Sequence, residues 1–195
     1  KNLPAKLKGS AQYVMEYLFS EVLSRQTPVI RDYLLKTSIL NRFSAALCDA
    51  VCVEADEQEL PPEGAWGFIR YLKKENLFLI HLDDQNNWFR FHHLFQELLQ
   101  NQLRRLCSPE EIASLHSRAG EWFESHGFIT ESIQHAAAAG DFIRAAEIVE
   151  KHRSGEFEAE RWHVVHQWLR MLPDNVREKR LKLLLTDAWI RSMQH

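Results

Sequence analysis

The chain has 195 residues, of which 45% are hydrophobic and 26% charged, a composition typical of globular proteins. Its formal net charge is −3 and its isoelectric point is about 6.4, which argues against a surface that grips nucleic acid by charge alone. No apolar run approaches the ~20 residues that cross a bilayer, and the opening KNLPAK does not begin a signal peptide. We therefore expect a cytoplasmic protein with neither a nucleic-acid nor a membrane partner for this stretch.

Helical signals recur along the first half of the chain. An apolar stripe with helical spacing covers residues 11–22. Thr27-Pro28 predicts an N-cap followed by a proline in the first turn, and Ser44 predicts the cap of a short helix. Residues 54–64, EADEQELPPEG, are acidic with adjacent prolines and predict a loop. A helix over about 63–75 follows, with an apolar side made of Trp66, Ile69 and Leu72.

The helical period breaks between residues 77 and 91. Leu77–Leu82 and Trp88–Phe91 are short apolar or aromatic runs on either side of five turn-forming residues, DDQNN. Two such runs around a turn predict a β-hairpin, after which leucines resume helical spacing from Leu94 to Leu106. Helices that lead into one hairpin outline a winged-helix domain.

A second region begins at SPEE, residues 108–111, which has the spacing of a capping box with proline at the first helical position. Gly127, Gly140 and Gly155 then punctuate the chain, and each is followed by a predicted helix. We place these helices at 131–139, 142–151 and 157–172. The pattern favours degenerate helical-hairpin repeats at the start of a solenoid, and hence a piece of a longer protein.

The sequence contains no motif of a known catalytic or phosphate-binding site. There is no G-x-x-x-x-G-K-[ST], G-x-G-x-x-G, G-x-S-x-G, C-x-x-C or H-E-x-x-H. His163 and His166, with Glu160 before them, have a spacing that suits a metal, but a surface helix is the preferred interpretation. We therefore predict no catalytic residues, no metal ligands and no enzyme activity within this chain.

Three cysteines, Cys48, Cys52 and Cys107, are an odd number and argue against a secreted disulfide framework. Cys48 and Cys52 are four residues apart and share a face of any helix that contains them. Buried thiols that act as small hydrophobes are the favoured interpretation, with a reactive or metal-binding pair as the alternative.

His92 and His93 stand where the hairpin passes into the next helix. Backbone N–H groups in the first turn of a helix lack intrahelical acceptors, and the helix dipole is positive there. A neutral imidazole at this place can donate a hydrogen bond to a phosphate or a carboxylate. The alternative is that one histidine caps or packs while the other is solvated.

These residues also carry a family resemblance. YVMEYLFSEVLSRQTPVIRDYLLKTSILNRFSAALCDAV, ENLFLIHLDDQNNWFRFHHLFQELLQNQL and LHSRAGEWFESHGFITESIQHAAAAGD resemble the arm region of large ATP-dependent LuxR-type transcriptional regulators of the MalT-like kind. LRMLPDNVREKRLKLLLTDAW is similar to the helices that open that family's tetratricopeptide-like sensor. These regulators belong to the STAND class of signalling NTPases, and the resemblance covers most of the chain.

The resemblance implies a division into three parts. Residues 1–26 would end the helical domain of an NTPase module, 27–107 would form the winged helix, and 108–195 would begin the helical-repeat sensor. In related STAND proteins a Met-His-Asp motif opens a winged-helix helix, and its histidine touches the phosphate of bound ADP. His92 takes that histidine's place by resemblance, while His93 stands where the acid would be, which leaves the acid's function without a counterpart.

The function implied is a regulatory relay between an ATPase domain and a DNA-binding domain that are not in this sequence. ATP or ADP is expected in the full-length protein but no cofactor in this fragment. The partners implied are the protein's own nucleotide-binding domain, an inducer or regulatory protein, and a second copy on activation. The alternative from another class is a helical protein-interaction scaffold without nucleotide control.

Overall fold

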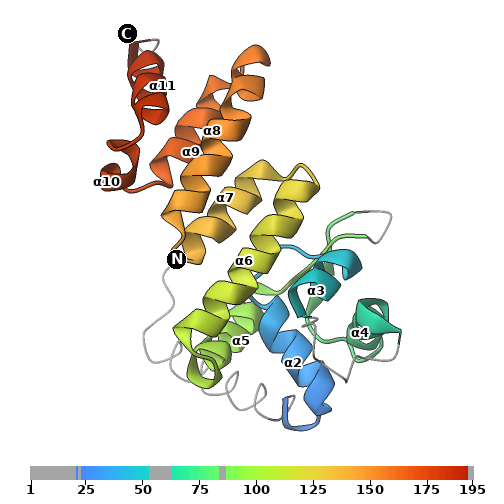
Figure 1. The fold of residues 1–195 in the computed structure, drawn as a ribbon. Helices are drawn as coiled ribbons and strands as arrows, with labels where there is room; N and C mark the ends of the chain where they lie inside the picture. The colour runs from blue at the N-terminus through green and yellow to red at the C-terminus, as the bar shows by residue number, and fades with distance from the viewer. Residues whose placement is uncertain (1–20, 22, 53–62, 84–86, 193–195) are drawn as a thin grey trace, which may run out of the picture. The chain divides into compact units, whose positions relative to one another are not determined.

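The computed structural model describes residues 21, 23–52, 63–83 and 87–192 (Figure 1). The chain is mainly helical, and in this described part it carries a single two-stranded antiparallel sheet, which confirms the predicted fold class. The chain is divided into two compact units, residues 1–108 and residues 109–195. The helix predicted over 11–22 and most of the predicted acidic loop fall outside the described residues.

The first unit contains helices, a hairpin and a final helix in the order of a winged helix. Its elements are α2 (Pro28–Thr37), α3 (Ala45–Cys52), α4 (Gly64–Lys74), β1 (Leu79–His81), β2 (Phe89–Phe91) and α5 (His93–Leu106).

The first two helices begin at the predicted caps. The Thr27 hydroxyl accepts a hydrogen bond from the Ile30 N–H of α2, and Pro28 is the first helical residue. The Ser44 hydroxyl accepts from the Leu47 N–H of α3 at 3.3 Å. Both cap predictions are therefore confirmed.

Helix α4 is present, but the prediction that Trp66 belongs to its buried side is wrong. Trp66 is 51% exposed, because the buried stripe runs through Ala65, Phe68, Ile69 and Leu72 at i, i+3, i+4 and i+7. Trp66 lies about 100° around the helix from that stripe's first residue.

A residue of α3 caps α4. The side chain of Glu63 makes no capping bond, and the Asp49 carboxylate instead accepts the Ala65 N–H at 3.0 Å. Gly64 sits beside that carboxylate with φ +60, a conformation that L side chains rarely adopt. The Asp49 side chain therefore ties the start of α4 to α3.

The predicted β-hairpin is confirmed, with strands shorter than the apolar runs. Leu79 pairs with Phe91 and His81 with Phe89. Phe43, in the connection between α2 and α3, extends the pairing because it exchanges two backbone hydrogen bonds of 2.8 Å with Phe89. The hairpin is thus tied to the helical part of the unit through the backbone of β2.

Strand β2 alternates between buried and exposed side chains. Phe89 and Phe91 are 0% and 1% exposed, whereas Arg90 between them is exposed. The ring of Phe91 lies 4.8 Å from that of Phe43 and 5.7 Å from that of Phe95 on α5, measured between centroids. These aromatic contacts form the part of the core that joins the hairpin to α5.

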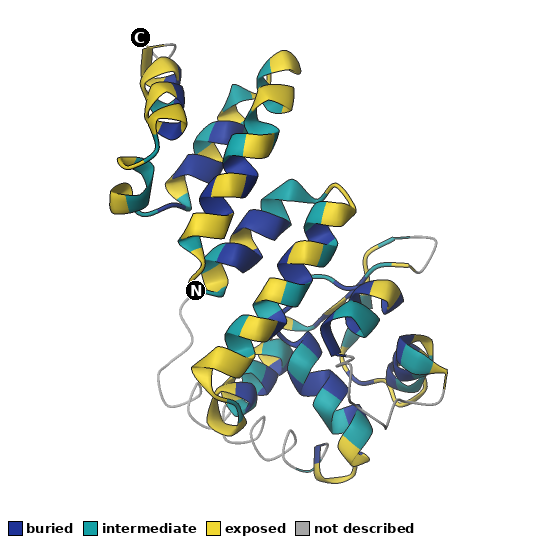
Figure 2. Cartoon of the chain, viewed as in Figure 1, coloured by how far each residue is buried: buried dark blue, intermediate teal, exposed yellow. Residues whose placement is uncertain are grey.

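The second unit consists of helices, most of which pack on the next helix along the chain (Figure 1). They are α6 (Pro109–Ser125), α7 (Ile129–Ala138), α8 (Phe142–Glu158), α9 (Trp162–Arg170), α10 (Asp174–Arg177) and α11 (Leu181–Ser192). Figure 2 shows the buried residues of α6 to α9 gathered on the sides of these helices that face their neighbours. The largest of the buried side chains is Trp168 on α9.

A 33-residue spacing relates the two helical hairpins of this unit. The starts of α6 and α8 are residues 109 and 142, and the starts of α7 and α9 are residues 129 and 162. The short helices also bury matching positions, since His135 and Ala136 on α7 correspond to Trp168 and Leu169 on α9. The hairpins are therefore structural repeats.

The helix boundary predicted at Gly155 is wrong. Gly155 lies inside α8, and the chain turns instead around Glu160, which has φ +58. Glu160 is 33 residues after Gly127, whose φ is +80 at the equivalent turn. Both hairpins therefore have a residue with positive φ at the same turn, and only the first of these residues is a glycine. A prediction based on glycine positions therefore placed the second boundary wrongly.

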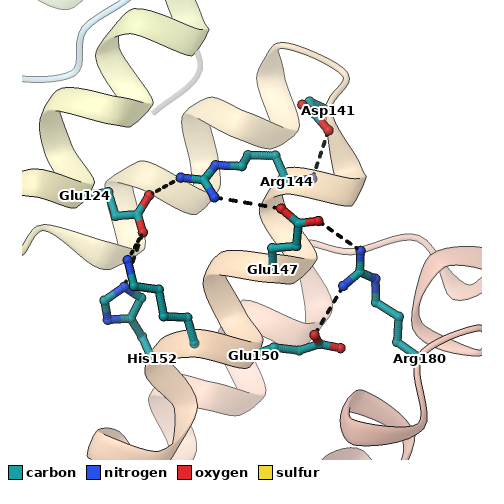
Figure 3. Close-up of polar contacts among 8 residues, drawn as sticks. Glu124, Asp141, Arg144, Glu147, Glu150, His152 and Arg180 are labelled. Atoms are coloured by element: carbon teal, nitrogen blue, oxygen red, sulfur yellow. Dashed lines mark hydrogen bonds and ion pairs between the residues drawn. The ribbon is translucent and has the colours of Figure 1, made fainter.

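Ion pairs connect α6, α8 and the segment before α11 (Figure 3). The Glu124 side chain is 9% exposed. Its carboxylate oxygens form ion pairs with Arg144 Nη2 at 2.6 Å and with Lys151 Nζ at 2.8 Å. Burial opposes ionisation of Glu124, but the hydrogen bond from Lys151 and the charge of Arg144 hold its pKa below the usual range. Arg180, before α11, lies 3.2 Å from Glu150 and 3.6 Å from Glu147 on α8.

The aromatic anchor of the hairpin gives a stability prediction. Phe91→Ala removes a fully buried ring between Phe43 and Phe95 and should lower the free energy of unfolding of the first unit by about 3–5 kcal/mol. Arg90→Ala changes the exposed neighbour and should cost less than about 0.5 kcal/mol. Urea denaturation of both variants measures the difference, and equal losses would show that β2 is not anchored through Phe91.

Candidate functional site

His92 occupies the junction between β2 and α5 that the sequence singled out. It is the N-cap residue of α5, with extended backbone angles of φ −60 and ψ 136. Its backbone N–H donates to the Phe78 carbonyl at 2.8 Å, and its own carbonyl accepts the Gln96 N–H at 3.0 Å. The backbone of His92 is thus fixed from both sides, by Phe78 just before β1 and by the first turn of α5.

The position of Phe78 is itself unusual. Phe78 has φ +51, which is rare for a bulky residue, and its ring lies 5.0 Å from that of Phe95 between centroids, tilted by 30°. The carbonyl that holds His92 therefore belongs to a backbone conformation that the surrounding contacts maintain. Non-glycine residues in this region carry a local energetic cost and cluster at functional sites, which makes this junction a candidate.

The side chains of the two histidines do not cap the helix. His92 is half-buried and makes no side-chain capping bond, while His93, the first residue of α5, is exposed. The two rings lie 4.5 Å apart between centroids at an angle of 34°. The structure therefore brings both imidazoles to one place at the start of α5 and assigns the cap to neither.

Two glutamines fasten α5 to the α2–α3 connection. Gln96 Nε2 donates to the carbonyls of Ser38 and Leu40, each at 2.9 Å. Gln100 Nε2, one turn later, donates to the Ser38 carbonyl at 2.8 Å. Gln96 and Gln100 were not predicted as functional residues, and the only sequence signal for them is their i, i+4 spacing, which places both on one side of α5.

The first turn of α5 suits an anion. It contains no acidic side chain, and its first N–H groups lack intrahelical acceptors. A carboxylate or phosphate placed there would meet these donors together with an imidazole. The residues present are therefore compatible with the ADP phosphate that the resemblance implies, and the backbone of His92 is held on both sides.

The other candidates from the sequence do not form a site. Cys48 and Cys52 are fully buried in α3, which confirms the interpretation as small hydrophobes, and burial followed by the nearby Asp49 raises the pKa of Cys48. Glu160 lies at a turn before α9 rather than on one helix with His163 and His166. Among the described residues no three potential ligands gather into a metal site.

A basic face on α4 was not expected from the sequence. Arg70, Lys73 and Lys74 are exposed on the same side of the helix as Trp66. Arg70 forms an ion pair with Glu63, and Lys73 Nζ lies 4.8 Å from the centre of the Phe89 ring. Two of the three cations are therefore already engaged within the unit.

The second unit contains a buried histidine pair that sequence spacing could not reveal. His116 Nδ1 on α6 and His135 Nδ1 on α7 are 2.8 Å apart, so one donates and the other accepts. Burial, and then the neighbouring His116, lowers the pKa of His135 to about 3, and burial lowers the pKa of His116. The pair is therefore neutral at ordinary pH and serves to join α6 to α7.

No helix of the described residues is both long and apolar enough to cross a membrane.

Known proteins share sequence similarity with this chain over the region that contains the α5 junction. A profile of the MalT winged helix domain matches residues 19–111. The chain is 32% identical over 189 residues to the HTH-type transcriptional regulator MalT of Klebsiella pneumoniae and 31% identical over 186 residues to MalT of Cronobacter sakazakii. Each alignment covers 95% of this chain and 20% of the relative.

A relative with a different name matches over the same region. The serine/threonine-protein kinase PknK of Mycobacterium tuberculosis is 31% identical over 183 residues, which is 94% of this chain and 16% of the kinase. The chain therefore spans a fifth or less of the length of these curated relatives.

The histidine pair predicts a pH dependence of stability. Folding lowers the pKa of both imidazoles, while in the unfolded state each accepts a proton near pH ~6.5. The unfolded state thus binds more protons as the pH falls below that value. His135 alone should cost the second unit about 1.4 kcal/mol per pH unit, and His116, whose pKa is also lowered, should add to the loss. Urea denaturation at about pH 7.5 and about pH 5 tests this loss.

Two variants separate the pair from the other histidines. His135→Gln should reduce the pH slope, because it removes the more strongly depressed group. His163→Gln, at an exposed position of α9, should leave the slope unchanged. A slope that is the same in all three proteins would show that the pair does not govern acid stability.

Proposed function

Through residues 19–111 the chain belongs to the MalT winged-helix domain family, and we propose that it is the regulatory relay of a larger ATP-dependent transcription regulator. In this role it couples the nucleotide state of a separate ATPase domain to a helical region that receives a signal. The observation that carries the proposal is the junction at His92, where the backbone is fixed and the side chain is not used as a cap.

The comparison with a kinase supports a relay rather than an output function. A region with 31–32% identity and 94–95% coverage of this chain occurs in proteins named as a transcriptional regulator and as a protein kinase. A region shared by proteins with different outputs suits the processing of an input signal. The DNA-binding domain of a LuxR-type regulator is the output that the MalT relatives favour.

In the proposed resting state, His92 donates a hydrogen bond to the phosphate of ADP held by the ATPase domain. The first turn of α5 contains no acidic side chain to interact with its N–H groups and the positive end of the helix dipole. The phosphate of bound ADP would supply that negative charge. Phe78 and Gln96 contribute indirectly, because they hold the backbone on both sides of His92. His93 stands at the position of the acid in the related motif but is not an acid. Because its side chain is exposed, we assign it a contact with a neighbouring domain.

The proposed cycle follows from differential binding to two states. The winged helix clamps the ADP-bound ATPase domain, and exchange to ATP removes the contact and permits self-association. The second unit, whose hairpins repeat every 33 residues, acts as the start of a tetratricopeptide-like sensor for an inducer or a regulatory protein. The protein acts in the cytoplasm.

The same 33-residue repeats favour a second candidate function. Stacked helical hairpins present extended surfaces that bind other proteins. The chain would then be an interaction scaffold without nucleotide control, and changes at His92 would leave nucleotide binding unaffected.

The relay predicts the effect of His92→Ala in the full-length protein. A hydrogen bond to a charged group contributes roughly 1.5–3 kcal/mol, so losing one that exists only in the closed state should shift the closed–open balance by about 10–150-fold. His92→Ala should speed ADP release and raise reporter activity without inducer. His93→Ala should change ADP release less.

The measurement combines the ADP release rate, reporter output and thermal stability of both variants. A general loss of folding would lower activity in both proteins and would appear in the melting temperature. An unchanged ADP release rate in a stably folded His92→Ala protein would reject the relay and favour the scaffold.

The relay also predicts that this chain alone binds neither ATP nor duplex DNA. It has no phosphate-binding loop and a net charge of −3, and two of the three cations on α4 are engaged. Calorimetry with ATP and mobility shifts with DNA at low and high salt test the two statements. Micromolar ATP binding, or DNA binding that weakens steeply with salt, would contradict them.

A further inference from the structure

A cavity of ≈ 410 Å³ lies between α8 and α11 in the second unit. Small-ligand sites are typically about 300–1,000 Å³ and are mostly apolar with a few polar groups. Phe157 and Trp189 form one wall, with ring centroids 4.9 Å apart and an edge-on angle of 81°. The remaining lining consists of Leu185, Thr186, Arg153 and Lys182.

The charge of this cavity differs from that of its unit. Residues 109–195 hold 14 acidic and 11 basic side chains, yet the cavity is lined by two cations and no carboxylate. Neither Arg153 nor Lys182 forms a salt bridge within the described residues. The cavity therefore carries two positive charges that the unit does not balance locally.

A second cavity along α11 shows the usual arrangement. It is lined by Arg177 and Arg191 together with Asp187 and other acids. Both arginines form ion pairs there, Arg191 with Asp187 at 2.6 Å and Arg177 with Asp174 and Asp187. Compensated charges bind an added anion weakly, so the contrast singles out the cavity beside Trp189.

The guanidinium of Arg153 is held in position at the cavity. Arg153 Nη1 donates to Thr186 Oγ1 at 3.0 Å, and Thr186 in turn donates to the Lys182 carbonyl at 2.7 Å. The Arg153 Nε is buried and has no hydrogen-bond partner in the structure. A fixed guanidinium with unused donor capacity is suited to a carboxylate, since little rotamer freedom remains to be lost on binding.

We propose that this cavity binds a small aromatic carboxylate. The flat ring packs against Phe157 and Trp189, and the carboxylate accepts hydrogen bonds from Arg153 and Lys182. The site would give the second unit a small-molecule input of its own. It rests only on residues 153–189 and does not depend on His92 or on nucleotide, so the relay and this site can fail separately.

The test compares two probes of nearly equal shape with this chain. Titration calorimetry or ligand-observed NMR measures binding of 2-naphthoate and of its uncharged amide, 2-naphthamide. The carboxylate should bind about 10-fold more tightly or better, because a hydrogen bond to a charged group is lost in the amide. Equal affinities, or no binding of 2-naphthoate, would overturn the proposal.

Matched variants locate the site. Lys182→Gln should weaken 2-naphthoate binding by about 10-fold, while Lys179→Gln, an exposed lysine outside the cavity lining, should not. Trp189→Leu should also weaken binding, whereas Trp66→Leu in the first unit should have no effect. Thermal melts confirm that each variant is folded. Equal losses in the paired variants would mean that binding occurs elsewhere, which would reject the site.

Discussion

The alternation of side chains along β2 is the constraint on which the first unit depends. Phe89 and Phe91 enter the core and Arg90 does not, so a shift of one residue would expose both rings. Two backbone hydrogen bonds between Phe43 and Phe89 hold the strand against the α2–α3 connection. This register places His92, the residue after Phe91, at the N-cap of α5. The place of the candidate functional residue is therefore a consequence of how the hairpin packs.

The same junction explains how a local contact would reach the rest of the unit. Helix α5 is bound to the α2–α3 connection by Gln96 and Gln100, and to the hairpin by the ring of Phe95. A contact at His92 therefore acts on a helix that is held to two other parts of the unit. This arrangement suits a relay, in which a hydrogen bond at one end biases the position of a whole element. In the second unit, the ion pairs around Glu124 serve a comparable purpose because they join α6 to α8 (Figure 3).

The sequence predicted those features that depend on local patterns. The caps at Thr27 and Ser44, the proline positions and the change of period at the hairpin all depend on neighbouring residues, and they are confirmed. The failures have physical causes. Trp66 was placed on one apolar side of its helix with Ile69 and Leu72 because of its spacing from them, and Gly155 was assigned to a turn because glycine usually marks one. The equivalent turn is instead made by Glu160, and the pairing of His116 with His135 depends on helix packing that spacing alone does not reveal.

We propose that the start of α5 senses the nucleotide through His92. Hydrogen–deuterium exchange of the full-length protein tests it most directly, at the amides of residues 93–95 in the first turn of α5. These amides lack intrahelical acceptors, so their exchange reports what lies against them. The account predicts slower exchange with ADP bound than with ATP bound, while the core amides of α5 stay unchanged. Identical exchange of the first turn in the two nucleotide states would contradict the account.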